Sequence, residues 1–385
     1  MRKVYSDNAA TTPVAPEVVE AMIPALREQF GNPSSTHAFG RSSRAVIERA
    51  RRSIAKLLNT STQSIVFTSG GTEADNMAIM CSLRDLGVSR IITSPIEHHA
   101  VLHTAEAMAT EGACKLELVK VNDRGEVDLN HLEELLKSSD EKTLVSLMHA
   151  NNEIGTLIDL TEVGNLVHSH GAIFHSDTVQ SMAHYEFDMQ TLPVDFITCA
   201  AHKFHGPKGV GFLYINPKLN IKPIIHGGAQ ERNLRGGTEN LIGIVGLAKA
   251  METAYEHLAE HRAHIESLKA AMIMGLRETV PNIQFNGCSS EMSKSLYTVL
   301  SVCFPKTEFS DFLLINLDIL GIAASGGSAC SSGSNVGSHV LAAVKGSTDD
   351  RPTVRFSFGR FTTHEEVDYA LAKVRELYLD SLQKA

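Results

Sequence analysis

The chain has 385 residues, of which 43% are hydrophobic and 21% charged, and its formal net charge is −9. This composition predicts a globular protein of about two domains. The acidic balance argues against nucleic acid as a partner, because phosphate backbones attract an excess of Lys and Arg. The N-terminus lacks the apolar run of a secretory signal, and no stretch of roughly 18 apolar residues occurs. We therefore expect a cytoplasmic protein that does not bind a membrane.

The first element that stands out in chain order is a basic run, Arg41–Arg52, which interrupts the acidic balance. We interpret it as the solvated face of a helix. A docking surface for an acidic partner is the alternative.

Between Ser64 and Ile215, short β-rich runs alternate with amphipathic stretches. The expected strands are Ser64–Thr68, Arg90–Thr93, Leu116–Val121, Thr143–His149, Ala172–Ser176, Asp195–Cys199 and Gly209–Ile215. The expected helices between them include Glu73–Leu86, His99–Glu111, Leu129–Lys137 and Leu160–His170. This alternation predicts an α/β fold with a largely parallel sheet covered on both faces. Ligands in such folds bind at the carboxyl ends of the strands.

The pattern changes in the C-terminal part of the chain. The expected elements there are a long helical region, Leu241–Glu278, a strand Ser295–Phe304, a helix Glu308–Ile319, a strand Thr353–Phe358 and a helix Thr363–Gln383. Thr363 and Glu366 have the spacing of a capping box at the start of the last helix. We expect a smaller α+β domain, against which the N-terminal dozen residues pack.

Asp177 and Lys203 each follow a predicted strand. Pyridoxal phosphate (PLP) needs a lysine amine to form a Schiff base with its aldehyde, and a carboxylate to keep its pyridine nitrogen protonated. An Asp and a Lys at the ends of neighbouring strands could supply both. A surface Asp and a surface Lys near strand ends are the alternative.

A small-residue segment, Thr68–Asp75, lies between a predicted strand and a predicted helix. Small residues let backbone N–H groups approach an anion, and a helix N-terminus favours negative charge. The segment lacks the Lys-Ser/Thr spacing of a Walker A loop. It predicts a phosphate cradle, with an ordinary glycine-rich turn as the alternative.

His98 and His99 follow the next predicted strand. An imidazole over a flat cofactor ring can stack on it and move protons. A solvated loop histidine and a metal ligand are the alternatives. Two further histidines, His202 and His205, favour the metal-ligand alternative. Because no carboxylate or Cys stands at ligand spacing, we expect no metal.

Six cysteines occur, and no pair has the CxxC spacing of a zinc or thioredoxin motif. Cys330 alone sits among Ser and Gly, in the segment Ser325–Ser334. That composition is typical of a mobile, exposed loop, in which a thiol could reach a substrate and then a partner. A buried, inert thiol beside a turn is the alternative.

Several motifs appear in one order along nearly the whole chain. They are Tyr5–Thr12, Phe30–His37, Ser69–Glu73, Met148–Gly155, His205–Gly209, Arg235–Asn240, Ser328–Cys330 and Arg355–Phe361. Together they resemble the group I (NifS/IscS-type) cysteine desulfurases, which are PLP-dependent enzymes of the class-V aminotransferase family.

The resemblance implies a fold and a domain division. The fold is PLP fold type I, the aspartate-aminotransferase-like α/β fold, with a large mostly parallel-sheet domain and a smaller α+β domain. We place the large, PLP-binding domain at residues 14–255. Residues 1–13 and 256–385 form the small domain, which carries the catalytic Cys loop at about 325–346. The resemblance also implies a homodimer.

The resemblance assigns cofactor contacts residue by residue. Lys203 matches the Schiff-base lysine, Asp177 the pyridine-nitrogen carboxylate and His98 the stacking histidine. Gln180 matches the glutamine near the ring hydroxyl. The phosphate contacts match Gly71, Thr72 and His202, and Thr238 matches a threonine that reaches the phosphate from the neighbouring subunit.

The resemblance also assigns the substrate contacts. Arg355 fits the carboxylate of the amino acid, because guanidinium and carboxylate match in a planar, bidentate pair; Arg360 could compete for this role. Asn152 is placed near both the cofactor and that carboxylate. Cys330 is the thiol that accepts sulfur as a persulfide.

The implied reaction removes sulfur from L-cysteine and gives L-alanine and a Cys330 persulfide. The sulfur then passes to an acceptor, for which an iron–sulfur scaffold protein is the first choice. A selenocysteine lyase, another class-V aminotransferase and a non-catalytic sulfur-carrier scaffold are the alternatives.

Two positions depart from the family pattern. Ala200 stands where a serine usually helps to hold the phosphate, and Gly326 stands where serine is common. We expect somewhat weaker PLP retention from the first, unless Ser69 or Thr72 compensates, and a looser catalytic loop from the second.

Overall fold

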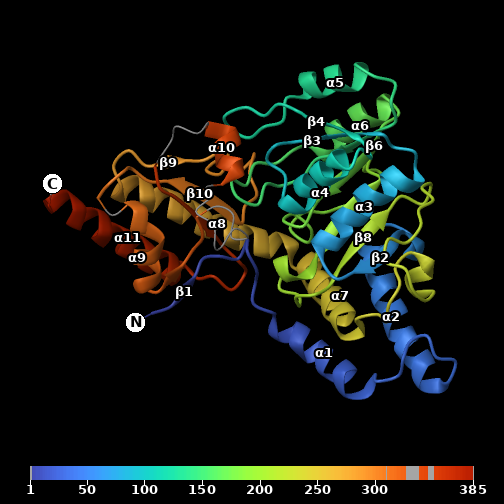
Figure 1. The fold of residues 1–385 in the computed structure, drawn as a ribbon. Helices are drawn as coiled ribbons and strands as arrows, with labels where there is room; N and C mark the ends of the chain where they lie inside the picture. The colour runs from blue at the N-terminus through green and yellow to red at the C-terminus, as the bar shows by residue number, and fades with distance from the viewer. Residues whose placement is uncertain (1, 309, 327–337, 346–350, 385) are drawn as a thin grey trace.

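The computed structural model describes residues 2–308, 310–326, 338–345 and 351–384 (Figure 1). Its main feature is a seven-stranded sheet with the order β2-β8-β7-β6-β5-β3-β4. The strands are β2 (Ile65–Thr68), β3 (Arg90–Thr93), β4 (Lys115–Leu118), β5 (Thr143–Ser146), β6 (Ile173–Asp177), β7 (Phe196–Ala200) and β8 (Gly211–Ile215). Of these described strands, only β8 runs in the direction opposite to the other six. The predicted α/β fold with a largely parallel sheet is confirmed.

The sheet is covered by helices on both faces. In β2, Ile65 and Phe67 belong to one apolar cluster and Val66 to another. Side chains alternate along a strand, so the two clusters lie on opposite faces. The helices between the strands are α3 (Gly71–Asp85), α4 (His99–Thr110), α5 (Leu129–Lys137) and α6 (Leu160–Ser169), each within a few residues of its prediction. Burial on both faces explains the continuous apolar runs of the inner strands.

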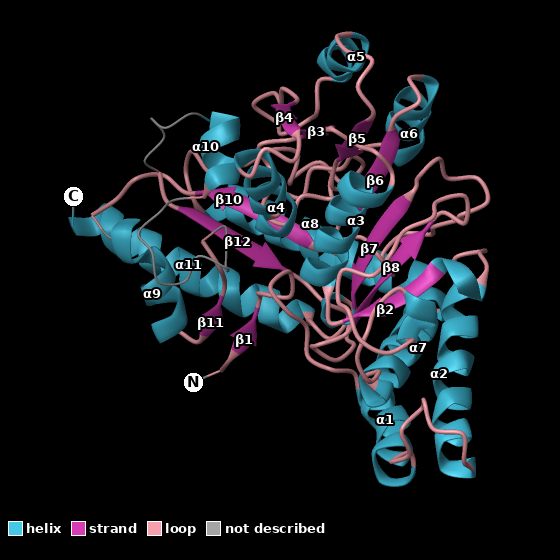
Figure 2. Ribbon diagram, turned by 45° about the vertical axis from the view of Figure 1, so that its right-hand side comes forward, coloured by secondary structure: helices cyan, strands magenta, loops and turns pink. Residues whose placement is uncertain are grey.

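Three further helices pack together beside the sheet (Figure 2). They are α1 (Pro16–Glu28), α2 (Ala38–Leu57) and α7 (Leu241–Glu256). The sequence analysis did not identify α1, whose pattern is obscured by Pro16 at its start and Pro24 inside it.

The interpretation of Arg41–Arg52 as a solvated helix face is wrong at Arg51. This side chain is buried, and its two terminal nitrogens lie 2.7 and 2.8 Å from the carboxylate oxygens of Glu231. A paired, bidentate ion pair explains why the arginine can leave the solvent.

The second part of the molecule contains a three-stranded antiparallel sheet, β12-β10-β9, and two long helices. These elements are β9 (Gln284–Phe285), β10 (Val299–Cys303), β12 (Thr353–Ser357), α8 (Leu258–Thr279) and α11 (His364–Lys384). The predicted capping box is present, since the backbone N–H of Glu366 donates to the Thr363 hydroxyl (3.2 Å) and that of Thr363 donates to the Glu366 carboxylate (2.8 Å). The predicted long helical region is two helices, α7 and α8, which meet at His257.

The N-terminus joins this second part. Strand β1 (Val4–Tyr5) pairs in parallel with β11 (Ile322–Ala323), as expected. Two short helices, α9 (Leu313–Ile319) and α10 (His339–Lys345), complete the described elements. The second part has its own apolar cluster, but the domain limits at residues 13 and 255 stay a prediction. No described helix is long and apolar enough to cross a membrane.

Candidate active site

The carboxyl ends of β6 and β7 open onto a cavity of about 330 Å³. Strand β6 ends at Asp177, and a short 3-10 turn, Ala201–Lys203, follows β7. The two strands are parallel neighbours, so their carboxyl ends meet at one sheet edge. Fifteen residues line the cavity: Ala9, Ala10, Gly71, Thr72, Asp75, His98, Met148, Asn152, Asp177, Val179, Gln180, Ala200, His202, Lys203 and Arg355.

Of the ten predicted site residues that the structure describes, nine therefore line one cavity and one, Thr238, does not. Thr238 lines a separate cavity with Arg235 and Glu239, away from Lys203. The contribution of Thr238 from a neighbouring subunit stays a prediction. Cys330 and its neighbours from 327 to 337 lie outside the described residues.

Lys203 is anchored at the edge of the cavity. Its Nζ donates to the carbonyl oxygens of Ala9 at 2.7 Å and Ala10 at 2.9 Å. The Ala9 carbonyl also accepts from the Gln180 amide at 3.0 Å. The N-terminal segment thus holds both side chains in place. The sequence did not predict this role, because the contacts are made by backbone carbonyls and the alanine side chains give no sign of them.

The start of α3 has the properties of an anion cradle. Gly70 has a φ of 155°, which L side chains rarely adopt, and a Cβ on Gly71 would lie only 2.7 Å from the Val179 side chain. Glycine is therefore required at both positions. The Glu73 carboxylate accepts from the Ser69 N–H at 2.9 Å and pairs with Arg235, which fixes the turn. The N–H groups at the start of a helix favour a phosphate.

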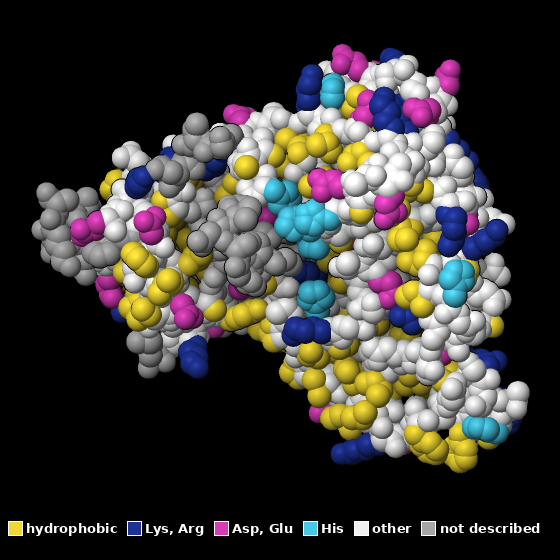
Figure 3. Space-filling view, in the orientation of Figure 1, with side chains coloured by type: hydrophobic (Ala, Val, Ile, Leu, Met, Phe, Trp, Pro, Cys, Tyr) yellow, Lys and Arg dark blue, Asp and Glu magenta, His cyan; other side chains and the backbone are white. Residues whose placement is uncertain are grey.

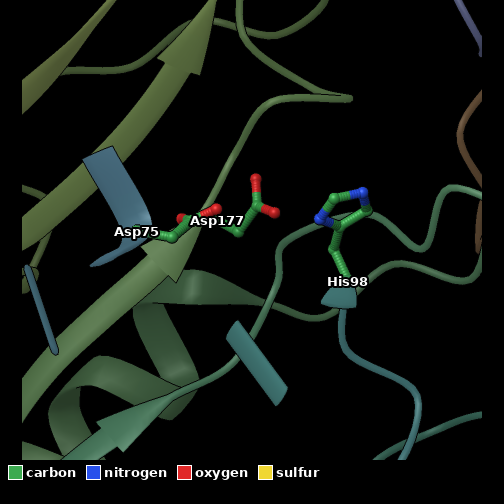
Figure 4. A group of neighbouring side chains, drawn as sticks. All are labelled: Asp75, His98 and Asp177. Atoms are coloured by element: carbon green, nitrogen blue, oxygen red, sulfur yellow. The ribbon is translucent and has the colours of Figure 1, made fainter. Parts of the chain in front are cut away.

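Two buried carboxyl groups, Asp177 and Asp75, lie beside His98 (Figure 4). Burial, reinforced by Asp75, raises the pKa of Asp177 to about 7. Burial likewise raises the pKa of Asp75 to about 7, opposed by a hydrogen bond from Thr198. A cation placed against Asp177 would restore its charge, so the pocket fits a protonated pyridine nitrogen. The sequence analysis gave no site role to Asp75, although this residue ends the predicted phosphate cradle, Thr68–Asp75.

His98 is the N-cap residue of α4, where its Nδ1 accepts from the Ala100 N–H at 3.1 Å. The proton of the neutral ring is therefore on Nε2. Burial, with a further contribution from Lys203, lowers the pKa of His98 to about 4. The ligand atoms of His98, Asp75 and Asp177 all lie within 4.8 Å of one another, so a metal could be considered there. These three side chains line the same cavity as Lys203.

Arg355, on β12, closes the opposite side of the cavity. One terminal nitrogen donates to the Asn152 carbonyl at 2.8 Å and the other pairs with Asp7 at 2.9 Å. Its Nε is buried with no hydrogen-bond partner among the described residues, so the N–H of this nitrogen remains available to a ligand. Arg360, the competing arginine, instead pairs with Glu17 and lines a different cavity.

His202 and His205 are occupied by protein groups. The ring of His202 lies 3.2 Å from the Thr11 hydroxyl, and burial lowers its pKa to about 4. The Nδ1 of His205 donates to the Pro13 carbonyl at 2.9 Å. Both histidines fasten the N-terminal segment to the turn that carries Lys203.

A parallel sheet with Lys203 and Asp177 at the carboxyl ends of adjacent strands defines an α/β enzyme of PLP fold type I. The chain belongs to the aminotransferase class-V family, whose sequence model matches residues 4–370.

Within this family the chain is similar to cysteine desulfurases of the IscS and NifS type. It is 42% identical to the putative cysteine desulfurase IscS 1 of Bacillus subtilis, over 98% of this chain and 99% of the relative, and 42% identical to the cysteine desulfurase IscS of Methanosarcina thermophila, over 98% and 92%. Among solved structures, a NifS-like protein matches with a TM-score of 0.89 and 38% identity, covering 98% of this chain and 99% of that one. The apo structure of the cysteine desulfurase from Thermococcus onnurineus matches with a TM-score of 0.87 and 26% identity, covering 98% and 95%.

Proposed function

We propose that this protein is a PLP-dependent cysteine desulfurase that transfers the sulfur of L-cysteine to its own Cys330. One observation carries the proposal: Lys203, Asp177, His98 and Arg355 line a single cavity in a chain 42% identical, over nearly its whole length, to a protein named as a cysteine desulfurase. A solved relative with 31% identity and a TM-score of 0.79, covering 94% of this chain and 100% of that one, is described as SspA in complex with cysteine.

The cavity fits the cofactor at both ends. The turn before α3 supplies Gly71 and Thr72 for the phosphate, together with His202, and Asp177 supplies a carboxylate for the ring nitrogen. Gln180 would contact the ring hydroxyl, and Thr238 of a second copy would complete the phosphate site in a homodimer. Bound PLP withdraws electrons from the substrate carbons, which lets the bond to sulfur break.

The substrate is positioned and attacked by the chain's own residues. Arg355 and Asn152 bind the carboxylate of cysteine, and Lys203 moves the proton of its α-carbon. The Cys330 thiolate attacks the substrate sulfur, so that an S–S bond forms while the Cβ–S bond breaks and its electron pair stays with the carbon. After proton uptake the products are alanine and a Cys330 persulfide. His98 exchanges protons with the substrate thiol.

The sulfur then leaves for an acceptor protein, of which an iron–sulfur cluster scaffold is our first choice. We propose the cytoplasm as the location. A selenocysteine lyase is the second candidate, because selenium and sulfur share this chemistry, and the relative rates with the two amino acids separate them.

Cysteine labelled with ³⁵S tests the function. The wild-type protein should retain label on Cys330, released by reductant, while alanine forms without an added keto acid. Cys330→Ser should keep the yellow cofactor and lose sulfide release. An aminotransferase would need a keto acid and would retain no label, and a sulfur-carrier scaffold would give no alanine even with added PLP.

A further inference from the structure

A cluster of three histidines lies outside the cavity, where α4 meets α10. His99 and His103 are four residues apart on α4, and His339 begins α10. The rings of His99 and His103 are stacked, with centroids 4.3 Å apart and planes inclined by 9°. Figure 3 shows histidine side chains gathered on this face of the molecule. None of the cavity roles described above uses these three side chains.

One hydrogen bond fixes the tautomer of His339. Its Nε2 lies 2.9 Å from the carbonyl oxygen of Glu97, and a carbonyl can only accept, so Nε2 carries the proton. The lone pair of a neutral His339 is therefore on Nδ1, which lies 3.1 Å from His99 Nε2. A carbonyl partner on the far nitrogen is the usual outer support of a metal-binding histidine.

The separation of these two nitrogens suits a metal ion. Ligand nitrogens at about 2.0–2.1 Å from a tetrahedral zinc are roughly 3.3–3.4 Å apart. The 3.1 Å distance between His99 and His339 needs only a small change to reach that value. His103 is exposed, one helical turn from His99 on the same face, so rotation of its side chain can supply a third nitrogen.

We propose that His99, His103 and His339 form a binding site for a divalent transition-metal ion of the zinc class, with water in the fourth position. Burial and the two neighbouring imidazoles lower the pKa of His99. Glu106, one turn further along α4, provides a nearby negative charge.

The site would fasten α10 to the large sheet. Val340 and Val344 of α10 already pack against Ile96 and Ile154. Neither Ile96 nor Ile154 belongs to α4, so a metal ion shared by α4 and α10 would add a separate attachment, to α4 itself. Binding to the folded protein alone would raise its melting temperature with zinc concentration.

Equilibrium dialysis of the PLP-loaded protein against Zn²⁺ tests the site. Cys330→Ser serves as the parent protein, so that the acceptor thiol cannot bind zinc, and bound PLP occupies the cavity with Asp75 and Asp177. We expect one zinc ion per chain. His103→Gln and His339→Gln should each weaken its binding at least tenfold, the order expected when support of a bound metal is lost, without altering the visible absorbance of the cofactor.

His261→Gln is the matched control. His257 and His261 have the same four-residue spacing, at the start of α8, with ring centroids 5.6 Å apart. This substitution should leave the zinc affinity unchanged. The proposal fails if the parent binds no zinc, or if His103→Gln and His339→Gln bind it as tightly as the parent. Neither result would bear on the desulfurase proposal, because no step of that reaction uses these histidines.

Discussion

The two walls of the Lys203 cavity are built in different ways. The sheet-edge wall, formed by Gly71, Asp177 and Lys203, stands on the ends of secondary-structure elements. The long-range wall, formed by Ala9 and Arg355, joins segments of the chain that are far apart in sequence. The Arg355–Asp7 ion pair of that wall spans 348 residues. The first wall carries the buried acid and the amine that we propose as the reactive group, and the second carries the guanidinium that we propose for the substrate. We infer that local structure brings the proposed cofactor residues to the sheet edge, that the Ala9 and Ala10 carbonyls then fix Lys203, and that long-range packing positions the proposed substrate residue.

Replacing the amine of the sheet-edge wall should have the largest effect. Lys203→Ala removes the amine that we propose binds the cofactor aldehyde and moves the α-proton, and a positioned base alone contributes about 10²–10⁴-fold. We expect no measurable alanine formation and no visible absorbance from lysine-bound cofactor. Absorbance spectra and an alanine assay measure this.

Lys203→Arg separates chemistry from structure, because it keeps a donor for the carbonyls of Ala9 and Ala10 but cannot condense with an aldehyde. It should be as inactive as Lys203→Ala. Lys208→Ala, at an exposed lysine of the same segment, is the control and should stay active. A persisting visible band in Lys203→Ala would contradict the assignment.

Replacing the guanidinium of the long-range wall should weaken substrate binding and leave cofactor binding unchanged. Arg355→Lys keeps the charge but loses the planar pair of donors. Charge-assisted hydrogen bonds contribute about 1.5–3 kcal/mol, so kcat/KM should fall roughly 10- to 150-fold, with most of the change in KM. Steady-state kinetics with cysteine and a PLP titration measure both parts.

Arg360→Lys is the matched control, since Arg360 pairs with Glu17 outside the cavity. It should leave KM within about twofold of wild type, as expected for a group that makes no contact with the substrate. A larger rise in KM for Arg360→Lys than for Arg355→Lys would reverse our assignment of the carboxylate site.

The sequence predicted the sheet-edge wall well and the long-range wall in part. Asp177 and Lys203 could be placed because each follows a β-rich run, and parallel strands bring their carboxyl ends together. Arg355 was identified only through resemblance, since nothing local shows that it meets Asn152 and Asp7. The carbonyl groups of Ala9 and Ala10 could not be predicted, because a backbone contact leaves no mark in the side-chain pattern.

Asp177 allows a smaller, pH-dependent test of the sheet-edge wall. Without cofactor, its pKa of about 7 lies above the ordinary value of 3.8. The folded state then holds a proton that the unfolded state releases, so the contribution of this group to stability is full below about pH 4 and is lost as pH rises through 7. The substitution Asp177→Asn replaces the titrating carboxyl group with a neutral amide and so removes this loss.

We expect cofactor-free Asp177→Asn to be more stable than wild type at pH 8, by about 2–4 kcal/mol at 1.4 kcal/mol per pKa unit. The difference should shrink towards pH 4. Thermal melts across this range measure it, with exposed Asp123→Asn as a control that should show no such trend. A difference that does not change with pH would show that burial does not hold the proton on Asp177.

Ala200 lies beside the sheet-edge wall, at the position where the resembling family usually has a serine. Ala200→Ser should have the smallest effect. Ala200 ends β7, is 2% exposed and lies 3.7 Å from the position of a Cβ on Gly71, at the turn that we propose for the phosphate. A serine hydroxyl there gains one hydrogen bond of about 0.5–1.5 kcal/mol, which is roughly a 2- to 12-fold tighter PLP dissociation constant.

Ala200→Cys is the control for this gain, because a thiol has nearly the size of the hydroxyl but donates weakly. Fluorescence titration of the cofactor-free proteins should rank Ala200→Ser above both wild type and Ala200→Cys. Equal affinities for all three would mean that the N–H groups at the start of α3 already satisfy the phosphate. In that case the backbone alone would bind the cofactor phosphate at this wall, and alanine at position 200 would not weaken the affinity for PLP.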